Sequence, residues 1–215
     1  MRLVDSPTEQ TTAATDALLA LAALANVLYL SRIGASDAFK TRIWSWAFGL
    51  LAVASALGAV VHGLQMSERL VGLLWKPINL TLGLTVATFA VGVVYDLWGP
   101  AAARRALPIL IAVGVAFFAV TVIVPGTFRV FAVYEALAML FALITYVQLA
   151  ARGRLHGAAA MALGILISIV AAAVQASGAV SVTVLWEFDH NGIFHLIQIA
   201  GLIVLVAGLR TSLVA

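Results

Sequence analysis

Long apolar runs, separated by short polar connections, recur along almost the whole chain. A helix needs about 20 mainly apolar residues to cross the hydrocarbon of a bilayer, and seven runs reach that length. They lie at about residues 16–33, 42–65, 70–97, 102–124, 127–150, 156–180 and 190–210. The third run is long, so its helix could tilt or could end near Val94. The pattern predicts an all-α fold, a seven-transmembrane helix bundle that occupies residues 1–215 as a single domain.

Composition supports an integral, multi-pass membrane protein. The chain is 64% hydrophobic and 10% charged, whereas soluble domains carry roughly 25% charged residues. The first fifteen residues are polar and contain no basic segment leading into an apolar stretch. We therefore expect the first span to be retained as an anchor and not cleaved as a signal peptide. The chain contains no cysteine, so a disulfide framework is excluded.

Basic residues concentrate in alternate connections between the predicted spans. They are Arg32, Lys40, Arg42, Arg104, Arg105, Arg152, Arg154 and Arg210. The other connections are poorer in basic residues or carry acids, such as Asp5, Glu9 and Asp16 at the start. The positive-inside rule then predicts an outside N-terminus and a cytoplasmic C-terminus, in the cell (inner) membrane. This distribution accounts for the net charge of +3, so we expect no nucleic-acid partner.

Polar side chains gather in the predicted outer half of the spans, whereas the inner halves are nearly all apolar. His62 lies near the outer end of the second span, and His190 opens the seventh, with His195 about 7 Å deeper. The other members are Lys76, Asn79, Glu135, Gln175, Glu187, Asp189, Asn191 and Gln198. Polar groups facing lipid would lose their hydrogen bonds, so we expect them to turn inward. The sequence predicts a polar pocket in the outer half of the membrane.

Several of these residues also have purely structural interpretations. Glu135 could pair with Lys76 and hold two helices together, and Asp189 could cap the seventh helix. His156 belongs to a basic connection and is expected to be solvated. Small residues within the spans indicate close helix packing. The tryptophans are expected at the membrane interfaces; they are Trp44, Trp46, Trp75, Trp98 and Trp186.

Three histidines with an open fourth position describe a catalytic zinc site, in which the metal activates a water molecule. His62, His190 and His195 could supply this set, with a nearby carboxylate orienting a ligand or moving a proton. Residues five apart on a helix differ in direction by roughly 140°, so His190 can join His195 only from a distorted first turn. A site of two histidines completed by Asp189 is the alternative.

A histidine late in the second span, with WEFDHNGIFHLIQ opening the seventh, resembles the CREST superfamily of seven-transmembrane hydrolases. That group includes the alkaline ceramidases and the adiponectin/progestin receptors, and the chain is similar to a divergent bacterial-type member. Its pattern is a serine and a histidine in the second span, an aspartate nearby and HxxxH in the seventh span, with three zinc-binding histidines. The resemblance implies hydrolysis of a lipid amide or ester by zinc-activated water, with membrane lipids as partners and the lipid substrate arriving from the bilayer. It assigns His62 and His195 as metal ligands.

The chain departs from that pattern at three places. Asn191 stands where the first histidine of HxxxH is expected, with His190 beside it. Gly58 stands four residues before His62, where the serine is expected, although Ser55 lies on the same face. No aspartate occupies the expected acidic position, and Asn79 is the nearest polar residue. Together with Glu135 and Asp189, Ser55 and Asn79 complete the predicted catalytic residues.

Two other classes of function remain open. His62 and His195 could ligate one haem from two spans, as in b-type cytochromes. The outer-half pocket could instead serve a ligand-binding, transport or receptor-like protein without a metal, or a scaffold with a degenerate site. A transmembrane conduit is disfavoured because the inner halves carry no polar path. Retinal binding is excluded because the seventh span contains no lysine. The pattern carries no prediction of an oligomeric state.

Overall fold

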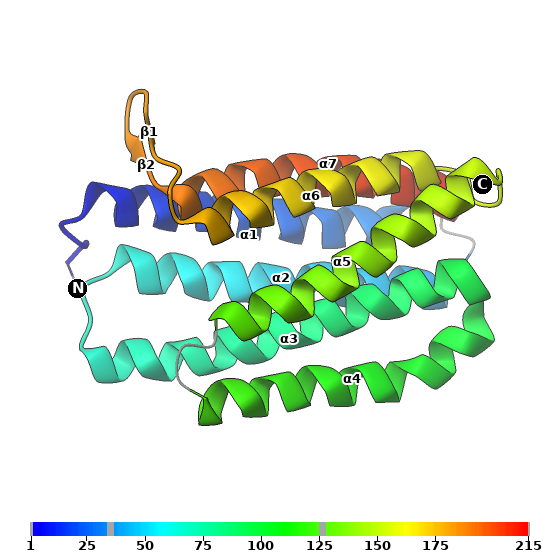
Figure 1. Cartoon of the computed structure of the whole chain (residues 1–215), viewed down its shortest axis with the longest axis horizontal. Coiled ribbons are helices and arrows are strands. Elements are labelled where there is room, and N and C mark those ends of the chain that lie inside the picture. The colour runs from blue at the N-terminus through cyan, green and yellow to red at the C-terminus, as the bar shows by residue number, and fades with distance from the viewer. Residues whose placement is uncertain (1, 34–36, 125–127, 215) are drawn as a thin grey trace.

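Seven helices lie side by side along one axis in a computed structural model, which describes residues 2–33, 37–124 and 128–214 (Figure 1). Each is long and apolar enough to cross a membrane, which confirms the predicted seven-transmembrane bundle and an integral, multi-pass membrane protein. The helices are α1 (Pro7–Arg32), α2 (Ala38–Gly63), α3 (Glu68–Trp98), α4 (Pro100–Ile123), α5 (Phe128–Ala151), α6 (Ala158–Ser177) and α7 (His190–Val214). A short antiparallel hairpin, β1 (Val182–Thr183) and β2 (Glu187–Phe188), connects α6 to α7.

The first helix begins at Pro7 and not near residue 16 as predicted. Its start is set by Ser6, whose hydroxyl accepts a hydrogen bond from the backbone N–H of Glu9, and by Pro7, whose missing N–H costs nothing at this position. The polar residues before position 16 are therefore helical because Ser6 and Pro7 set the start of the helix. The span prediction used only the apolar pattern, so it did not include them. The extra turns carry Thr11, Thr12 and Thr15 toward the interior of the bundle.

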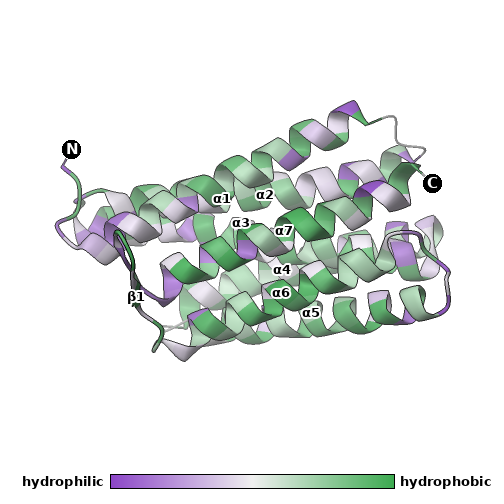
Figure 2. Cartoon of the chain, turned by 90° about the horizontal axis from the view of Figure 1, so that it is seen from above, coloured by the Kyte–Doolittle hydropathy of each residue, from purple (hydrophilic) through white to green (hydrophobic). Residues whose placement is uncertain are grey.

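The two ends of the bundle differ in charge and in polarity. We call the end that carries the N-terminus, the α2–α3 connection and the hairpin the N-terminal face, and the opposite end the C-terminal face (Figure 1). Polar residues mark both ends, whereas the flanks between them are mostly apolar (Figure 2). Exposed basic residues are more numerous at the C-terminal face, where they include Arg32, Arg104, Arg105, Arg152, Arg154 and Arg210, than at the N-terminal face, which has Arg2, Arg69 and Lys76.

Close packing of the last two helices depends on glycine. A Cβ added at Gly164 of α6 would lie 2.5 Å from the backbone nitrogen of Leu205, and one added at Gly201 of α7 would lie 2.7 Å from the Ser168 hydroxyl. Such distances leave no space for a side chain, so the backbones of α6 and α7 approach directly. The expectation of tight packing through small residues is confirmed here. The resulting contact fixes α7, which carries the central residue of the site.

Candidate functional site

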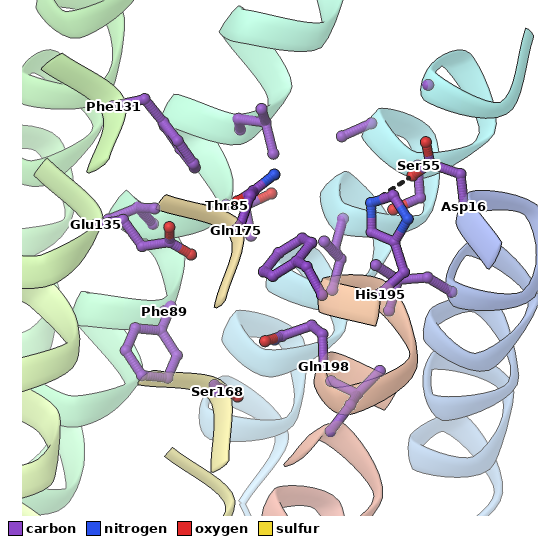
Figure 3. Close-up of a pocket in the computed structure, with 18 of the residues that line it drawn as sticks. Asp16, Ser55, Thr85, Phe89, Phe131, Glu135, Ser168, Gln175, His195 and Gln198 are labelled. Carbon is purple, nitrogen blue, oxygen red and sulfur yellow. Dashed lines mark ion pairs between the residues drawn. The ribbon is translucent and has the colours of Figure 1, made fainter. Parts of the chain in front are cut away.

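Six helices, α1, α2, α3, α5, α6 and α7, enclose a cavity of about 450 Å³ (Figure 3). Most of its lining is apolar, with aromatic residues such as Trp44, Phe48, Phe89 and Phe131. The ionisable side chains among its described lining residues are Asp16, His62, Glu135, His190 and His195. A mainly apolar cavity with a few converging polar groups is typical of a site for a small organic ligand.

Asp16 and His195 form a buried pair at the centre of one wall. The His195 Nε2 atom lies 3.3 Å from Asp16 Oδ1, and its Nδ1 atom lies 3.1 Å from the Thr15 hydroxyl. All three residues are almost entirely buried. Thr15 also lies 3.0 Å from the carbonyl oxygens of Thr11 and Thr12, to which its hydroxyl donates. The Thr15 oxygen therefore accepts a hydrogen bond from His195 Nδ1–H, and His195 Nε2 faces the Asp16 carboxyl group.

Two arrangements of the protons would leave the pair uncharged overall. Either Asp16 is ionised and His195 doubly protonated, or Asp16 is protonated and donates to a neutral ring. The two forms differ only in which atom holds one proton, and both have zero net charge. A neutral pair avoids the high cost of an isolated charge in a buried site. The pair can thus donate or accept a proton when a ligand alters its surroundings.

Gly58 of α2 provides the space for the Asp16 carboxylate. A Cβ at this position would lie 2.7 Å from Asp16 Oδ2, closer than a real Cβ contact allows. Ser55, one turn earlier on α2, lies beside the pair and lines the cavity (Figure 3). Gly58 stands at the position where the CREST pattern has a serine. In this structure the Asp16 carboxylate of α1 occupies the space that a side chain at position 58 would need.

Glu135 reaches into the cavity from α5, across from the Asp16–His195 pair (Figure 3). Within the described ranges, no side chain forms an ion pair or hydrogen bond with it. Lys76 is exposed on α3, so the pairing considered from the sequence does not form. Asn79 is half-buried and is not among the described residues that line the cavity. Glu135 is thus a carboxyl group available to a ligand.

The other two predicted metal ligands lie nearer the N-terminal face. His62 pairs with Glu9, with 2.7 Å between His62 Nδ1 and Glu9 Oε2, and its ring meets the Trp75 ring edge-on at a centroid distance of 6.1 Å. His190 begins α7 and lines the cavity there. His62, Trp75 and His190 therefore line the cavity at this end.

Asp189 caps α7, as one sequence interpretation proposed. Its Oδ1 atom accepts hydrogen bonds from the backbone N–H groups of Asn191 and Gly192 and from the Thr12 hydroxyl, at 3.0, 2.9 and 3.0 Å. Partial burial raises its pKa, but these hydrogen bonds and the nearby His190 outweigh it and leave the pKa below its ordinary value. Because Thr12 belongs to α1, the cap also joins α1 to α7.

The arrangement of these side chains does not fit a zinc ion. Throughout residues 2–33, 37–124 and 128–214, no three His, Cys, Asp or Glu side chains are grouped closely enough to hold a metal. Both ring nitrogens of His195 have protein partners, and His62 turns toward Glu9. The cavity brings His62, His190 and His195 to one space, but the predicted zinc site stays a prediction from the sequence.

Sequence reasoning missed Asp16 and Thr15, which form the site with His195. Asp16 counted only as one acid of a polar N-terminal segment, because the first span was expected to begin there. The available signal was that Asp16 immediately precedes the apolar run ALLALAALANVLYL. An acidic residue at that point of a membrane helix needs a partner inside the bundle.

A second buried polar cluster lies at the C-terminal face, where the sequence indicated mainly apolar residues. Lys40 Nζ lies 2.6 Å from Asp96 Oδ1 and 2.8 Å from the Ser212 hydroxyl, and the Tyr146 hydroxyl donates to Asp96 over 2.9 Å. The expectation of apolar inner halves is wrong at this place, where Lys40 and Ser212 lie within helices beyond the predicted spans and meet Asp96 and Tyr146. Trp44, expected at an interface, is instead buried in the core.

His156 is exposed in the α5–α6 connection, as expected.

Comparison with known proteins identifies a family but no relative of known activity. No curated protein and no solved structure matches the chain. A family model, described as a family of unknown function (DUF6962), matches residues 11–214. This range contains Asp16, Gly58, Glu135 and His195, and the chain belongs to this family of unknown function.

Proposed function

We propose that the protein binds an amphiphilic molecule from the membrane in the cavity between its helices. The observation that carries this proposal is the Asp16–His195 pair, buried in a largely apolar cavity and faced by the unpartnered Glu135. An apolar part of the ligand would contact residues such as Phe89 and Phe131. The polar group of the ligand would accept hydrogen bonds from the ionisable side chains or donate hydrogen bonds to them.

Charge restricts the polar group of the ligand. Asp16 and Glu135 are acidic, and the described lining contains no lysine or arginine. A phosphate or carboxylate would therefore enter the cavity without a fixed cation to compensate its charge. The favoured ligands are amphiphiles with an uncharged, hydrogen-bonding head, or with a cationic one.

Filling the cavity tests this proposal. The probe is a fluorescently labelled monoacylglycerol, compared with a labelled fatty acid and a labelled phospholipid, each titrated against purified protein in detergent. Ala138→Phe places a ring in the cavity lining, whereas Ala136→Phe adds the same ring on the exposed side of α5. We expect monoacylglycerol binding to weaken at least tenfold in Ala138→Phe only. Equal binding by both variants, or preference for the anionic probes, would overturn the proposal.

Hydrolysis of a lipid amide or ester, the function that the CREST resemblance implies, is a second candidate. It is supported by the same pair lying beside Ser55, because hydrolysis needs a group that takes a proton from the attacking water or hydroxyl. His195 with Asp16, or Glu135, could take that proton. The test is release of fatty acid from ceramide or monoacylglycerol in proteoliposomes, measured by mass spectrometry, for wild type and His195→Ala.

Metal content separates the zinc-dependent form of this candidate from a metal-free one. Near-stoichiometric zinc in the purified wild-type protein, lost in His195→Ala, would support it. Hydrolysis without bound metal would instead assign the reaction to the protein's own side chains. Absence of any product would leave ligand binding as the function.

We further infer that the protein lies in the cell membrane with the N-terminal face outside, because exposed arginines concentrate at the other face.

A further inference from the structure

The β1–β2 hairpin carries an apolar tip that no part of the described chain covers. Val184, Leu185 and Trp186 are 77%, 82% and 66% exposed, respectively. Residues 178–186, with the sequence GAVSVTVLW, contain no charged residue. Water-exposed turns are normally polar, so three consecutive exposed apolar side chains at a turn indicate contact with an apolar partner.

The hairpin projects sideways from the bundle, across the direction of the helix axes (Figure 1). In a protein whose helices cross a bilayer, a segment with this direction runs along the membrane plane and not out into water. The hairpin leaves the bundle where α6 ends and α7 begins, so it lies at the level of the membrane boundary on the N-terminal face. Tryptophan is enriched at that level, where its ring contacts both lipid and water.

Two further features indicate that the β1–β2 hairpin is stabilised by its surroundings. Only two residue pairs join the strands, Val182 with Phe188 and Thr183 with Glu187, and so small a hairpin is marginal in water on its own. Its base is held by α1, because the Thr11 hydroxyl donates to the Glu187 carbonyl oxygen over 2.7 Å. The base of the hairpin is therefore fixed to α1, whereas the apolar tip is exposed.

We propose that the hairpin tip, residues 184–186, inserts into the lipid interface beside the N-terminal face and anchors that end of the bundle to the membrane surface. The lipid bilayer is the partner because it already surrounds the apolar flanks of the seven helices, with which the tip is continuous. Because the tip carries no charge, its insertion does not require lipids with a particular headgroup charge. Insertion would hold the hairpin base, and with it the start of α7, at a fixed depth.

Site-directed fluorescence tests this proposal directly, since the chain contains no cysteine. Leu185→Cys is labelled with the environment-sensitive dye NBD and reconstituted into phosphatidylcholine vesicles, with aqueous iodide on both sides. The control is Glu68→Cys, an exposed position at the start of α3 on the same face. We expect the label at position 185 to be blue-shifted, shielded from iodide and quenched by a lipid carrying a doxyl group near its headgroup. The label at position 68 should show the reverse.

Val184→Cys provides an independent second position and should behave as Leu185→Cys does. Equal iodide quenching at positions 185 and 68 would overturn the proposal, because the tip would then lie in water. Shielding from iodide without quenching by the doxyl lipid, together with disulfide cross-linking between unlabelled Leu185→Cys copies, would also overturn it. That result would identify a second copy of the chain as the partner of the hairpin.

Discussion

Gly58 controls the geometry of the buried pair through its lack of a side chain. In Gly58→Ala the new methyl group would occupy the space of Asp16 Oδ2, which lies 2.7 Å from the added Cβ. The carboxylate must then shift, which disturbs its contact with His195 and the polar part of the cavity. We expect affinity for the monoacylglycerol probe to fall about tenfold, which corresponds to about 1.4 kcal/mol.

Gly49→Ala is a matched control on the same helix. A Cβ there would meet only Val27 Cγ2, at 4.0 Å, which is an ordinary van der Waals contact. Probe affinity should therefore stay at the wild-type value in a fluorescence titration, and thermal stability should hold or rise slightly, because alanine is the better helix former. Equal losses in both variants would show that the effect comes from the helix and not from the Asp16 contact.

At the scale of single residues, the sequence predicted one half of the site. His195, Glu135 and Ser55 were recognisable because polar residues stand out in apolar runs, and the cavity contains them all. Asp16 was not, because it stands at the very start of its apolar run and its partner on α7 is far away in the sequence. The role of Gly58 was equally hidden, since a close approach between α1 and α2 depends on packing that one sequence does not show.

Helices α2, α3, α5 and α7 meet at the buried Lys40–Asp96 ion pair. The two side chains are 4% and 1% exposed, so removing one charge leaves the other without compensation. We expect Asp96→Asn to destabilise the protein by about 3 kcal/mol, seen as a lower unfolding temperature in detergent. The double variant Lys40→Met with Asp96→Leu should recover much of the loss, because it removes both charges.

Arg42→Met provides the comparison for a charge that is exposed on the same helix. Its effect should stay within about 0.5 kcal/mol, as for most surface substitutions. If Asp96→Asn proved as mild as Arg42→Met, the ion pair would have no structural role and the cluster would need another explanation.

The cap of α7 should make stability depend on pH. Because the folded-state pKa of Asp189 lies below its ordinary value, its ionised form stabilises the fold above the unfolded pKa of about 3.9. That contribution disappears as pH falls through the lowered folded-state pKa. Asp189→Asn keeps a capping oxygen without the charge, so it should be less stable near neutral pH by up to about 1 kcal/mol.

Unfolding temperatures measured from pH 6 down to pH 3 would check this expectation. The difference between wild type and Asp189→Asn should shrink as the pH falls below about 3.9, because Asp189 is then progressively protonated and its charge no longer favours the folded state. A difference that stays constant over the range would mean that the Asp189 carboxylate acts through shape alone.

At the scale of elements, the apolar pattern located all seven helices but misplaced several ends. Hydropathy reports the part of a helix that faces lipid, whereas capping by Ser6, Asp37 and Ser67 sets where helices begin. The hairpin was missed for the opposite reason. Its apolar residues were too few for a span and were treated as part of the polar connection before His190.

The polar lining of the cavity and most of the exposed arginines lie toward opposite faces of the molecule. The cavity extends toward the N-terminal face, where His62, Trp75 and His190 line it, while the buried Lys40–Asp96 ion pair lies toward the C-terminal face. A ligand would therefore exchange with one side of the membrane or with the lipid beside it. The orientation of the bundle decides which compartment the site serves.

Cysteine labelling of intact cells would establish that orientation. Glu68→Cys lies on the N-terminal face, and His156→Cys lies in the α5–α6 connection while leaving Arg152 and Arg154 in place. Because orientation follows lysine and arginine and acids contribute little, neither change should invert the protein. We expect an impermeant maleimide to label Glu68→Cys in intact cells and His156→Cys only after permeabilisation. The opposite pattern would place the cavity entrance in the cytoplasm, and the ligand would then have to come from the inner leaflet.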